Sequence, residues 1–230
     1  MHILEGTVGE QKKRAAVVVG RFSAPTIGHY AVFDAAKKFI RDRQDLRLDA
    51  VPIVVVVDGK ETGKDKDRNP LSANERISFM KASGLADGIK FIVADSAFAA
   101  FEEVRKAGYE PIAVGAGSDR ANKYIEMLDK YFKAKNDKKI NHYAITLKRV
   151  SEGKSSEKID KDAALDDILR YMGDDIPTNM VSASLARRAI KQNEFKKFTI
   201  ISGLVKKPAL AKKMFNKVKA AMAMETPDGS

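Results

Sequence analysis

The sequence contains no cysteine. This absence excludes disulfide bonds, thiolate zinc sites and thiol nucleophiles together, and it favours a reducing, cytoplasmic setting. Long apolar runs are also missing, because no stretch approaches the roughly 18 uninterrupted apolar residues that a membrane span needs. The opening segment "MHILEGTVGEQKKR" carries an acid early and has no apolar core. We therefore expect neither a signal peptide nor a membrane partner.

Histidine is scarce too, with three in the chain. His2 and His142 have no metal-ligand spacing with His29, so we expect no metal site built from side chains alone. No Ser-His-Asp arrangement can be argued. The segment "GKETGKD" is not a phosphate-binding P-loop, because its glycine spacing is short and Asp65 follows Lys64.

Basic residues are in excess, with 42 Lys and Arg against 31 Asp and Glu and a formal net charge of +11. A surplus of this size favours anionic partners such as nucleotides, polyphosphates or nucleic acid. A solvated lysine surface explains it equally well. Much of the excess lies late, in "NEFKKF" and "LVKKPALAKKMFNKVKAAM".

Short β-branched runs alternate with segments of helical period through the first 150 residues. Such alternation implies right-handed βαβ units and a mostly parallel sheet covered on both faces. The sequence therefore predicts a doubly wound α/β domain with a five-stranded sheet, Rossmann-like in class, over residues 1–150. We expect strands at 15–19, 51–59, 89–95, 110–117 and 141–150, and helices at 29–43, 71–84, 96–108 and 118–134.

Helix boundaries and loops have their own signals. Ser72 and Glu75 have the spacing of a capping box, and Gly84 is expected to end the same helix. The polar segment 59–70 predicts an exposed, mobile loop.

Beyond residue 150 the pattern changes. We expect a loop at 151–162 and a helix at 163–173, within a segment 151–195 that completes the nucleotide site. Residues 196–230 form a basic helical tail. Its apolar residues either pack on the domain as one face of a helix or, with the lysines, dock nucleic acid or a partner helix; they are Phe195, Phe198, Leu204, Leu210, Met214 and Phe215.

The stretch "GRFSAPTIGHY" directly follows the first predicted strand. Ligands of open parallel sheets bind beyond the carboxyl ends of the strands, which is where this loop is expected. Gly20 would let a ligand approach the backbone, and a helix that begins near Gly28 offers unpaired amides to phosphate. Thr26 and His29 can each donate to a phosphate oxygen. The alternative is an ordinary strand-to-helix loop with a capping histidine.

The same stretch resembles the T/H-x-G-H signature of the nucleotidylyltransferase superfamily. The resemblance implies that His29 binds the triphosphate and that Thr26 fills the first signature position. The "GRF" opening, which adds Arg21 and Phe22 to the nucleotide-binding candidates, is similar to nicotinamide mononucleotide adenylyltransferases. Those enzymes usually have proline two residues after the phenylalanine, where this chain has Ala24.

A second stretch, "VSASLARRAI", resembles the late Ser-x-Ser/Thr-x-x-Arg motif of the same superfamily. It implies that Ser182 and Ser184 offer hydroxyls and helix amides to the nucleotide, and that Arg187 binds its β- and γ-phosphates. Arg188 is the neighbouring alternative. The residues alone also fit a plain serine-capped amphipathic helix.

Two further stretches point the same way. "VGAGSDR" is similar to the G-x-D segment with which these transferases contact nucleotide or acceptor, and it adds Gly117, Asp119 and Arg120 to the nucleotide-binding candidates. An ordinary strand-to-helix turn is the alternative. "NPLSANERISFM" resembles the helix after the second strand in nicotinamide mononucleotide adenylyltransferases. Arg76 in that helix either reaches the active-site region or lies on the helix surface.

The resemblance implies transfer of AMP from ATP, with Mg²⁺, to a small phosphorylated acceptor and release of pyrophosphate. His29, Thr26 and Arg187 are the catalytic candidates. Nicotinamide mononucleotide is the first acceptor to expect, with phosphopantetheine-type and cytidylyl transfer as alternatives, and relatives form homo-oligomers. A different class remains open, namely a non-catalytic protein of this fold that binds nucleic acid or an assembly.

Overall fold

A computed structural model describes residues 13–46, 49–59, 64–134, 142–147 and 181–223. The predicted loop at 151–162 and helix at 163–173 lie outside these residues. The elements in chain order are β1 (Lys13–Gly20), α1 (Ile27–Arg41), β2 (Ala50–Val57), α3 (Ala73–Ser83), β3 (Lys90–Ala94), α4 (Ala99–Lys106), β4 (Tyr109–Gly117), α5 (Ser118–Ala134), β5 (Tyr143–Leu147), α7 (Ala183–Lys191), α8 (Phe195–Ile201) and α9 (Pro208–Ala223).

The five strands form one parallel sheet in the order β3-β2-β1-β4-β5. The predicted doubly wound α/β fold is confirmed. Strand β1 is central and pairs with β2 on one side and β4 on the other, so the strand order reverses beside it. In open parallel sheets, ligands bind outside the carboxyl ends of the strands at such a reversal point. The loop that leaves β1 at Gly20 lies there.

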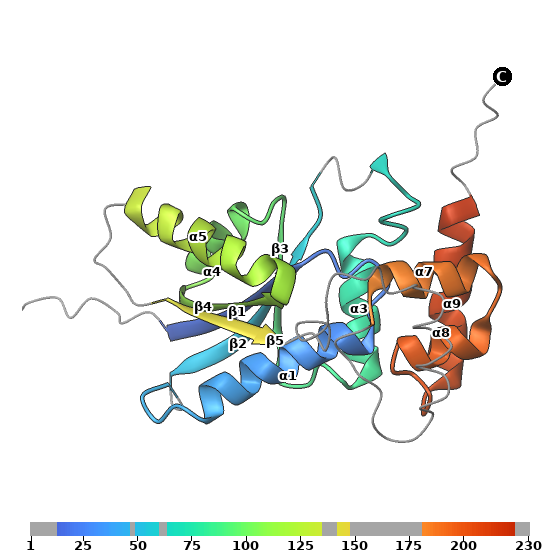
Figure 1. The fold of residues 1–230 in the computed structure, drawn as a ribbon, viewed down its shortest axis with the longest axis horizontal. Coiled ribbons are helices and arrows are strands. Elements are labelled where there is room, and N and C mark those ends of the chain that lie inside the picture. The colour runs from blue at the N-terminus through green and yellow to red at the C-terminus, as the bar shows by residue number, and fades with distance from the viewer. Residues whose placement is uncertain (1–12, 47–48, 60–63, 135–141, 148–180, 224–230) are drawn as a thin grey trace, which may run out of the picture.

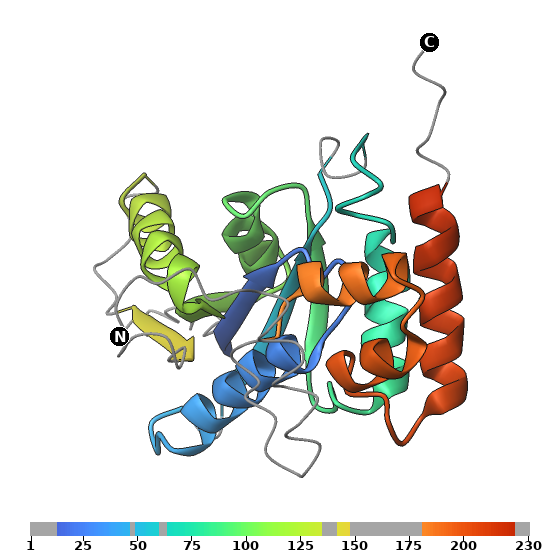
Figure 2. The same ribbon diagram turned by 45° about the vertical axis from the view of Figure 1, so that its right-hand side comes forward.

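Alternate residues of the buried strands face opposite layers, as the two-residue period of a strand requires. On one face of the sheet, Val18 and Val54 pack with Phe33 of α1 and Met80 of α3. On the other face, Val17 and its neighbours pack with α4 and α5. Figures 1 and 2 show these two helical layers with the sheet between them.

Helices α7, α8 and α9 lie together beside α3 at one side of the sheet (Figures 1 and 2). Their apolar residues form a third cluster that also includes Phe79 of α3 and Ala24 of the β1–α1 loop. Phe198, Leu204, Met214 and Phe215 are no more than 2% exposed. The tail therefore packs on the domain through its apolar face, and these side chains are not available to a partner.

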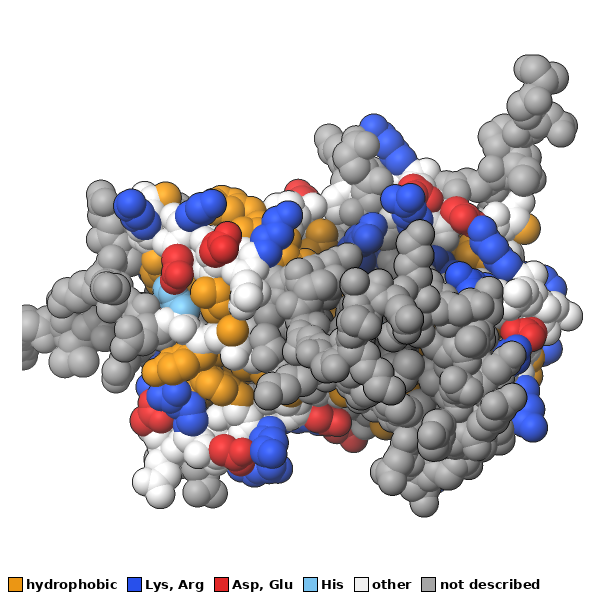
Figure 3. Space-filling view, in the orientation of Figure 1, with side chains coloured by type: hydrophobic (Ala, Val, Ile, Leu, Met, Phe, Trp, Pro, Cys, Tyr) orange, Lys and Arg blue, Asp and Glu red, His pale blue; other side chains and the backbone are white. Residues whose placement is uncertain are grey.

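The surface differs in character from this apolar interior. No helix in the described part of the chain has the length and apolarity to cross a membrane. Figure 3 shows basic side chains along the outer rim of the right-hand part of the molecule, where Figure 1 places α7 and α9.

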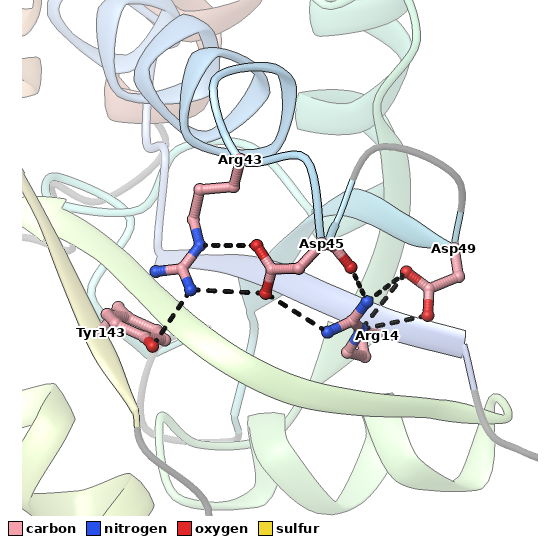
Figure 4. Close-up of polar contacts among 5 residues, drawn as sticks. All are labelled: Arg14, Arg43, Asp45, Asp49 and Tyr143. Atoms are coloured by element: carbon pink, nitrogen blue, oxygen red, sulfur yellow. Dashed lines mark hydrogen bonds and ion pairs between the residues drawn. The ribbon is translucent and has the colours of Figure 1, made fainter.

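A polar network closes the amino-terminal edge of the sheet, opposite the β1–α1 loop (Figure 4). Arg14 at the start of β1 contacts Asp49 with Nε–Oδ2 at 3.0 Å and also contacts Asp45. Asp45 in turn accepts from Arg43, whose guanidinium lies 4.2 Å from the ring centroid of Tyr143 in β5. The network joins the segment after α1 to both halves of the sheet.

Candidate functional site

The first turn of α1 is organised by a reciprocal contact between Thr26 and His29. Thr26 is the N-cap residue, and its backbone N–H donates to Nδ1 of His29 at 3.1 Å. A backbone amide can only donate, so Nδ1 must be an acceptor and the proton of the neutral ring must lie on Nε2. The cap thereby selects the tautomer whose Nε2–H can donate to an anion.

The Thr26 side chain contacts His29 and is itself buried. Thr26 is fully buried, and its Oγ1 lies 3.1 Å from Nδ1 of the histidine. The expected direct contact between the Thr26 hydroxyl and a phosphate is therefore not supported, because the hydroxyl has no exposed surface. His29 itself is partly exposed. Gly28 lies in the same first turn, where helical amides have no carbonyl partner within the helix.

Phe22 also acts on the histidine. Its ring is buried and meets the His29 ring edge-on, with centroids 5.1 Å apart, and it packs against Phe33 at 5.5 Å. A Cβ on Gly20 would lie 2.8 Å from the tip of the Phe22 ring. A side chain at position 20 would therefore clash with the Phe22 ring. This ring occupies the space beside the Gly20 backbone where the sequence predicted a ligand.

The β1–α1 loop has an unusual backbone. Phe22 and Ala24 both have positive φ, at 50° and 67°, a region that costs non-glycine residues about 1–2 kcal/mol each. Proline, whose φ is fixed near −65°, cannot adopt the conformation of Ala24. The departure from the proline of nicotinamide mononucleotide adenylyltransferases is therefore a real difference in loop geometry. Ala24 is fully buried and belongs to the apolar cluster of the C-terminal helices.

A buried polar contact holds this loop from the side of α3. Ser23 donates through Oγ to Oδ1 of Asn69 at 2.8 Å, and both residues are less than 5% exposed. The expectation of an exposed loop over 59–70 is wrong for its final residues, since Asn69 and Pro70 are buried. Neither Ser23 nor Asn69 was predicted as a site residue. An Asn-Pro pair directly before a helix signals only a turn.

Arg76 supports the same loop from below. It is fully buried, so the surface alternative for this residue is wrong. Its guanidinium donates to the backbone carbonyls of Val57, Ser72 and Arg21 and to the carboxylate of Asp58. Burial holds the pKa of Arg76 below its usual value, and the Asp58 carboxylate partly offsets that effect. One side chain thus joins the ends of β1 and β2 to the start of α3.

The other carboxylate oxygen of Asp58 accepts from the backbone N–H of Ala73 at 2.8 Å, in the first turn of α3. Asp58 directly follows β2, at the carboxyl edge of the sheet. An acidic residue directly after a predicted strand was the feature of the sequence that could have identified Asp58 as a candidate. Its two contacts assign it to the support of the loop.

The second phosphate-binding candidate, α7, begins with Ser182 as its N-cap. The Ser182 hydroxyl accepts from the amide of Leu185 at 3.3 Å, so the predicted serine cap is confirmed. Ser184 is exposed in the first turn, and its Oγ accepts from Arg187 at 3.4 Å. Arg187 also donates to the backbone carbonyl of Ser23 at 3.1 Å. The structure therefore brings α7 onto the β1–α1 loop.

The charges around Arg187 favour an anion. Burial is the main cause that lowers the pKa of Arg187, and repulsion by Arg21 adds to it, whereas Asp67 and Asp65 oppose the shift. Arg21 lowers the pKa of Arg76 as well. Arg21 is exposed and Arg187 is partly exposed, and their positive charges repel each other near the amino termini of α1 and α7. An anionic ligand beside both guanidiniums would reduce this repulsion.

The remaining candidates lie at the end of β4. Gly117 ends that strand and α5 begins at Ser118, so the junction lies at the same sheet edge as Gly20. The side chains of Asp119 and Arg120 lie outside the described residues, as do all side chains of 117–121. Their part in nucleotide binding stays a prediction.

Metal binding by side chains has no support in the described part of the chain, where no group of three or more His, Asp or Glu residues converges. Mg²⁺ dehydrates reluctantly and is commonly held through substrate phosphates together with only one or two carboxylates. A Mg²⁺ held mainly by the phosphates of a ligand would not need such a group.

The chain matches no known family and no curated protein. Among solved structures, the macrolide-efflux protein from Streptococcus pneumoniae aligns over 68% of this chain at 22% sequence identity, with a TM-score of 0.37. The chain covers 51% of that protein and so spans about half of its length. A likeness of this degree does not bear on activity.

Proposed function

We propose that this protein is a nucleotidyltransferase that moves AMP from ATP to a small phosphorylated acceptor and releases pyrophosphate. The observation that carries the proposal is the capping contact between Thr26 and His29. It leaves the proton of the neutral ring on Nε2, in the first turn of α1 that follows the carboxyl end of β1. Arg187 adds its support there, since it is bonded to the same loop and lies near Arg21.

The chemistry requires no nucleophilic side chain. An oxygen of the acceptor phosphate forms a bond to the α-phosphorus of ATP while the bond from that phosphorus to the bridging oxygen breaks. The protein then contributes position and charge stabilisation. Nε2–H of His29 would donate to an oxygen of the triphosphate as charge develops. Arg187, with the first-turn amides of α7, would hold the departing pyrophosphate. Mg²⁺ would neutralise charge on the phosphates.

The acceptor follows from resemblance alone. Nicotinamide mononucleotide is our first choice, and phosphopantetheine or a cytidylyl acceptor is the alternative. The loop backbone at Ala24 separates this chain from proline-bearing relatives. We place the reaction in the cytoplasm because the chain has no cysteine.

The test measures pyrophosphate release from ATP in the presence of Mg²⁺ with a panel of acceptors, of which nicotinamide mononucleotide is the first. The same panel is then measured with CTP in place of ATP as the nucleotide donor. His29→Ala should lower kcat by about 10²–10³, the effect of losing one donor to a developing oxyanion. His29→Gln is the sharper variant. Glutamine at the third helical position can still accept from the Thr26 amide through Oε1 and preserve the cap, but its own amide N–H groups do not lie where the ring Nε2–H of histidine lies.

Arg187 and Arg188 form a matched pair, because they are neighbours on α7 and Arg187 donates to the carbonyl of Ser23 in the β1–α1 loop. Arg187→Ala should weaken turnover much more than Arg188→Ala. If His29→Gln folds normally and keeps full turnover, the histidine serves only as a cap and the proposed chemistry is wrong. If no donor and acceptor pair reacts, the enzyme proposal fails.

A further inference from the structure

The positive charge of this chain is concentrated in one segment. Residues 195–223 contain eight lysines and no Asp, Glu or Arg. Without these lysines the chain would have 34 basic residues against 31 acidic ones, a surplus of three instead of eleven. On an ordinary solvated surface, acidic and basic side chains are interspersed, whereas every charged side chain of this segment is basic. The segregation indicates a function for α8 and α9 beyond packing.

The structure places these charges on the outer surface. Seven of the lysines are exposed and Lys197 is partly exposed. Within the described residues, carboxylate partners occur for Lys197, which pairs with Glu194, and for Lys217, which pairs with Glu75. The other six have no carboxylate partner in that part of the chain; they are Lys196, Lys206, Lys207, Lys212, Lys213 and Lys219.

Three of those six are also engaged in contacts of other kinds. Lys207 donates to the carbonyl of Ala82, Lys219 donates to Asn193, and Lys212 lies 4.9 Å from the ring centroid of Phe195. Lys196, Lys206 and Lys213 have no such contact with a described residue. One lies on α8, one in the turn that follows it and one on α9, so the uncompensated charge extends across both helices.

We propose that this lysine surface of α8 and α9 binds the phosphate backbone of double-stranded nucleic acid without sequence preference. Lysine is a compact point charge, and it suits a repeated phosphate array without the paired geometry that arginine gives to base recognition. Anionic membrane is a poorer fit. A helix that inserts at a membrane interface needs a free apolar face, and the apolar face of α9 is buried against α3, α7 and α8.

The surface is separate from the proposed catalytic site. None of its lysines contacts the β1–α1 loop or Arg187 among the described contacts. Binding of nucleic acid and nucleotidyl transfer can therefore each succeed or fail without the other.

The experiment measures the anisotropy of a fluorescent DNA duplex of about 24 base pairs with the full chain, without nucleotide, at 50 and 200 mM salt. Each lysine that neutralises a phosphate adds about 0.9 to the slope of log affinity against log salt. Three such contacts correspond to a loss of about 40-fold between these salt concentrations. The triple variant Lys196→Gln, Lys206→Gln, Lys213→Gln removes the three charges without breaking a contact to any residue that the structure describes. It should bind at least about tenfold more weakly at 50 mM salt and lower the slope by about 2.7.

The matched control is Lys123→Gln, Lys130→Gln, Lys133→Gln. It removes the same charge from exposed positions on α5, on the opposite side of the molecule from α9 (Figures 1 and 2). This control should bind as the unchanged protein does at matched salt, apart from a small effect of net charge. Equal losses in the two triple variants would show that net charge alone is responsible and would overturn the proposal. Failure to bind the duplex would also overturn the proposal. Binding to vesicles that contain phosphatidylserine, without binding to the duplex, would assign the lysine surface to a membrane instead.

Discussion

The guanidinium of Arg76 is bonded to the carboxylate of Asp58, and no part of the arginine is exposed. The pair lies under the β1–α1 loop and fixes the carbonyl of Arg21 relative to the end of β2 and the start of α3. Each N–H donor of a buried guanidinium needs an acceptor, and the carbonyl of Arg21 in the β1–α1 loop is one of those acceptors. The position of this loop therefore depends on Arg76 and Asp58, which are far from it in the sequence. Arg76 is a positioning residue, because it is fully buried beneath the β1–α1 loop.

Arg76→Met should cost about 3 kcal/mol in the free energy of unfolding, at the lower end for a broken buried pair because Asp58 is 25% exposed. Asp58→Asn should cost a similar amount, since it leaves the cation uncompensated. Urea denaturation of both variants and of the double variant measures the effect. The double variant should lose at least about 1 kcal/mol less than the sum. Strict additivity would mean that the two side chains do not depend on each other.

Much of the fold could be predicted from the sequence because it depends on local patterns. The run of valines in β2 and the alternation of apolar strands with amphipathic helices were sufficient for the parallel sheet. The caps of α3 were also evident, and both Ser72 and Gly84 are confirmed there, with φ of Gly84 at 73°. Helix α5 was predicted with the bounds that it has.

The site was predicted only in part, for a physical reason. His29 and Arg187 belong to recognisable motifs, and the structure brings both to one loop. The residues that hold this loop, Ser23 with Asn69 and Arg76 with Asp58, meet across 46 and 18 positions of sequence. No local pattern encodes such a pairing. The positive φ of Ala24 was equally hidden, because a proline missing from a motif does not tell which conformation replaces it.

Ala24→Pro should disrupt the β1–α1 loop, because proline cannot adopt a φ of 67°. We expect a loss of about 3 kcal/mol or more in the free energy of unfolding. Ala24→Gly is the control. It relieves about 1–2 kcal/mol of backbone strain and removes a buried methyl worth about 0.8 kcal/mol, so it should stay within about 1 kcal/mol of the unchanged protein. Thermal and urea denaturation of both variants provide the comparison, and a Pro variant as stable as the Gly variant would contradict this loop geometry.

Gly203→Ala tests whether the C-terminal helices support the first turn of α1. A Cβ on Gly203 would lie 2.6 Å from Cγ2 of Ile27, the first residue of that helix. The matched control is Gly88→Ala, since Gly88 has a similar φ, 76° against 71°, and no atom within 4 Å of its Cβ position. Both variants should lose about 1–2 kcal/mol from backbone conformation. Gly203→Ala should lose about 1–3 kcal/mol more through the clash. Urea denaturation measures the difference, and equal losses would show that the contact with Ile27 is easily relieved.

Tyr30, in the first half of α1, gives the fold a dependence on high pH. Burial raises the pKa of its hydroxyl to about 12 from the usual 10, and a hydrogen bond with Ser83 partly opposes that shift. The unfolded chain therefore loses this proton at a lower pH than the folded protein does. The stability contribution is complete below pH 10 and is lost as the pH rises from 10 toward 12, by about 1.4 kcal/mol per pH unit and about 2.7 kcal/mol in total.

Tyr30→Phe should remove this part of the pH dependence. Its free energy of unfolding should be slightly lower than that of the unchanged protein at pH 8, by about 1 kcal/mol for the lost contact with Ser83. The order should reverse by about pH 11.5, where the tyrosine of the unfolded chain is ionised. Urea denaturation of both proteins at pH 8 and near pH 11.5 tests the reversal. Parallel declines would mean that the Tyr30 hydroxyl ionises alike in both states, so the side chain would not be enclosed by α1 and α3 as the structure has it.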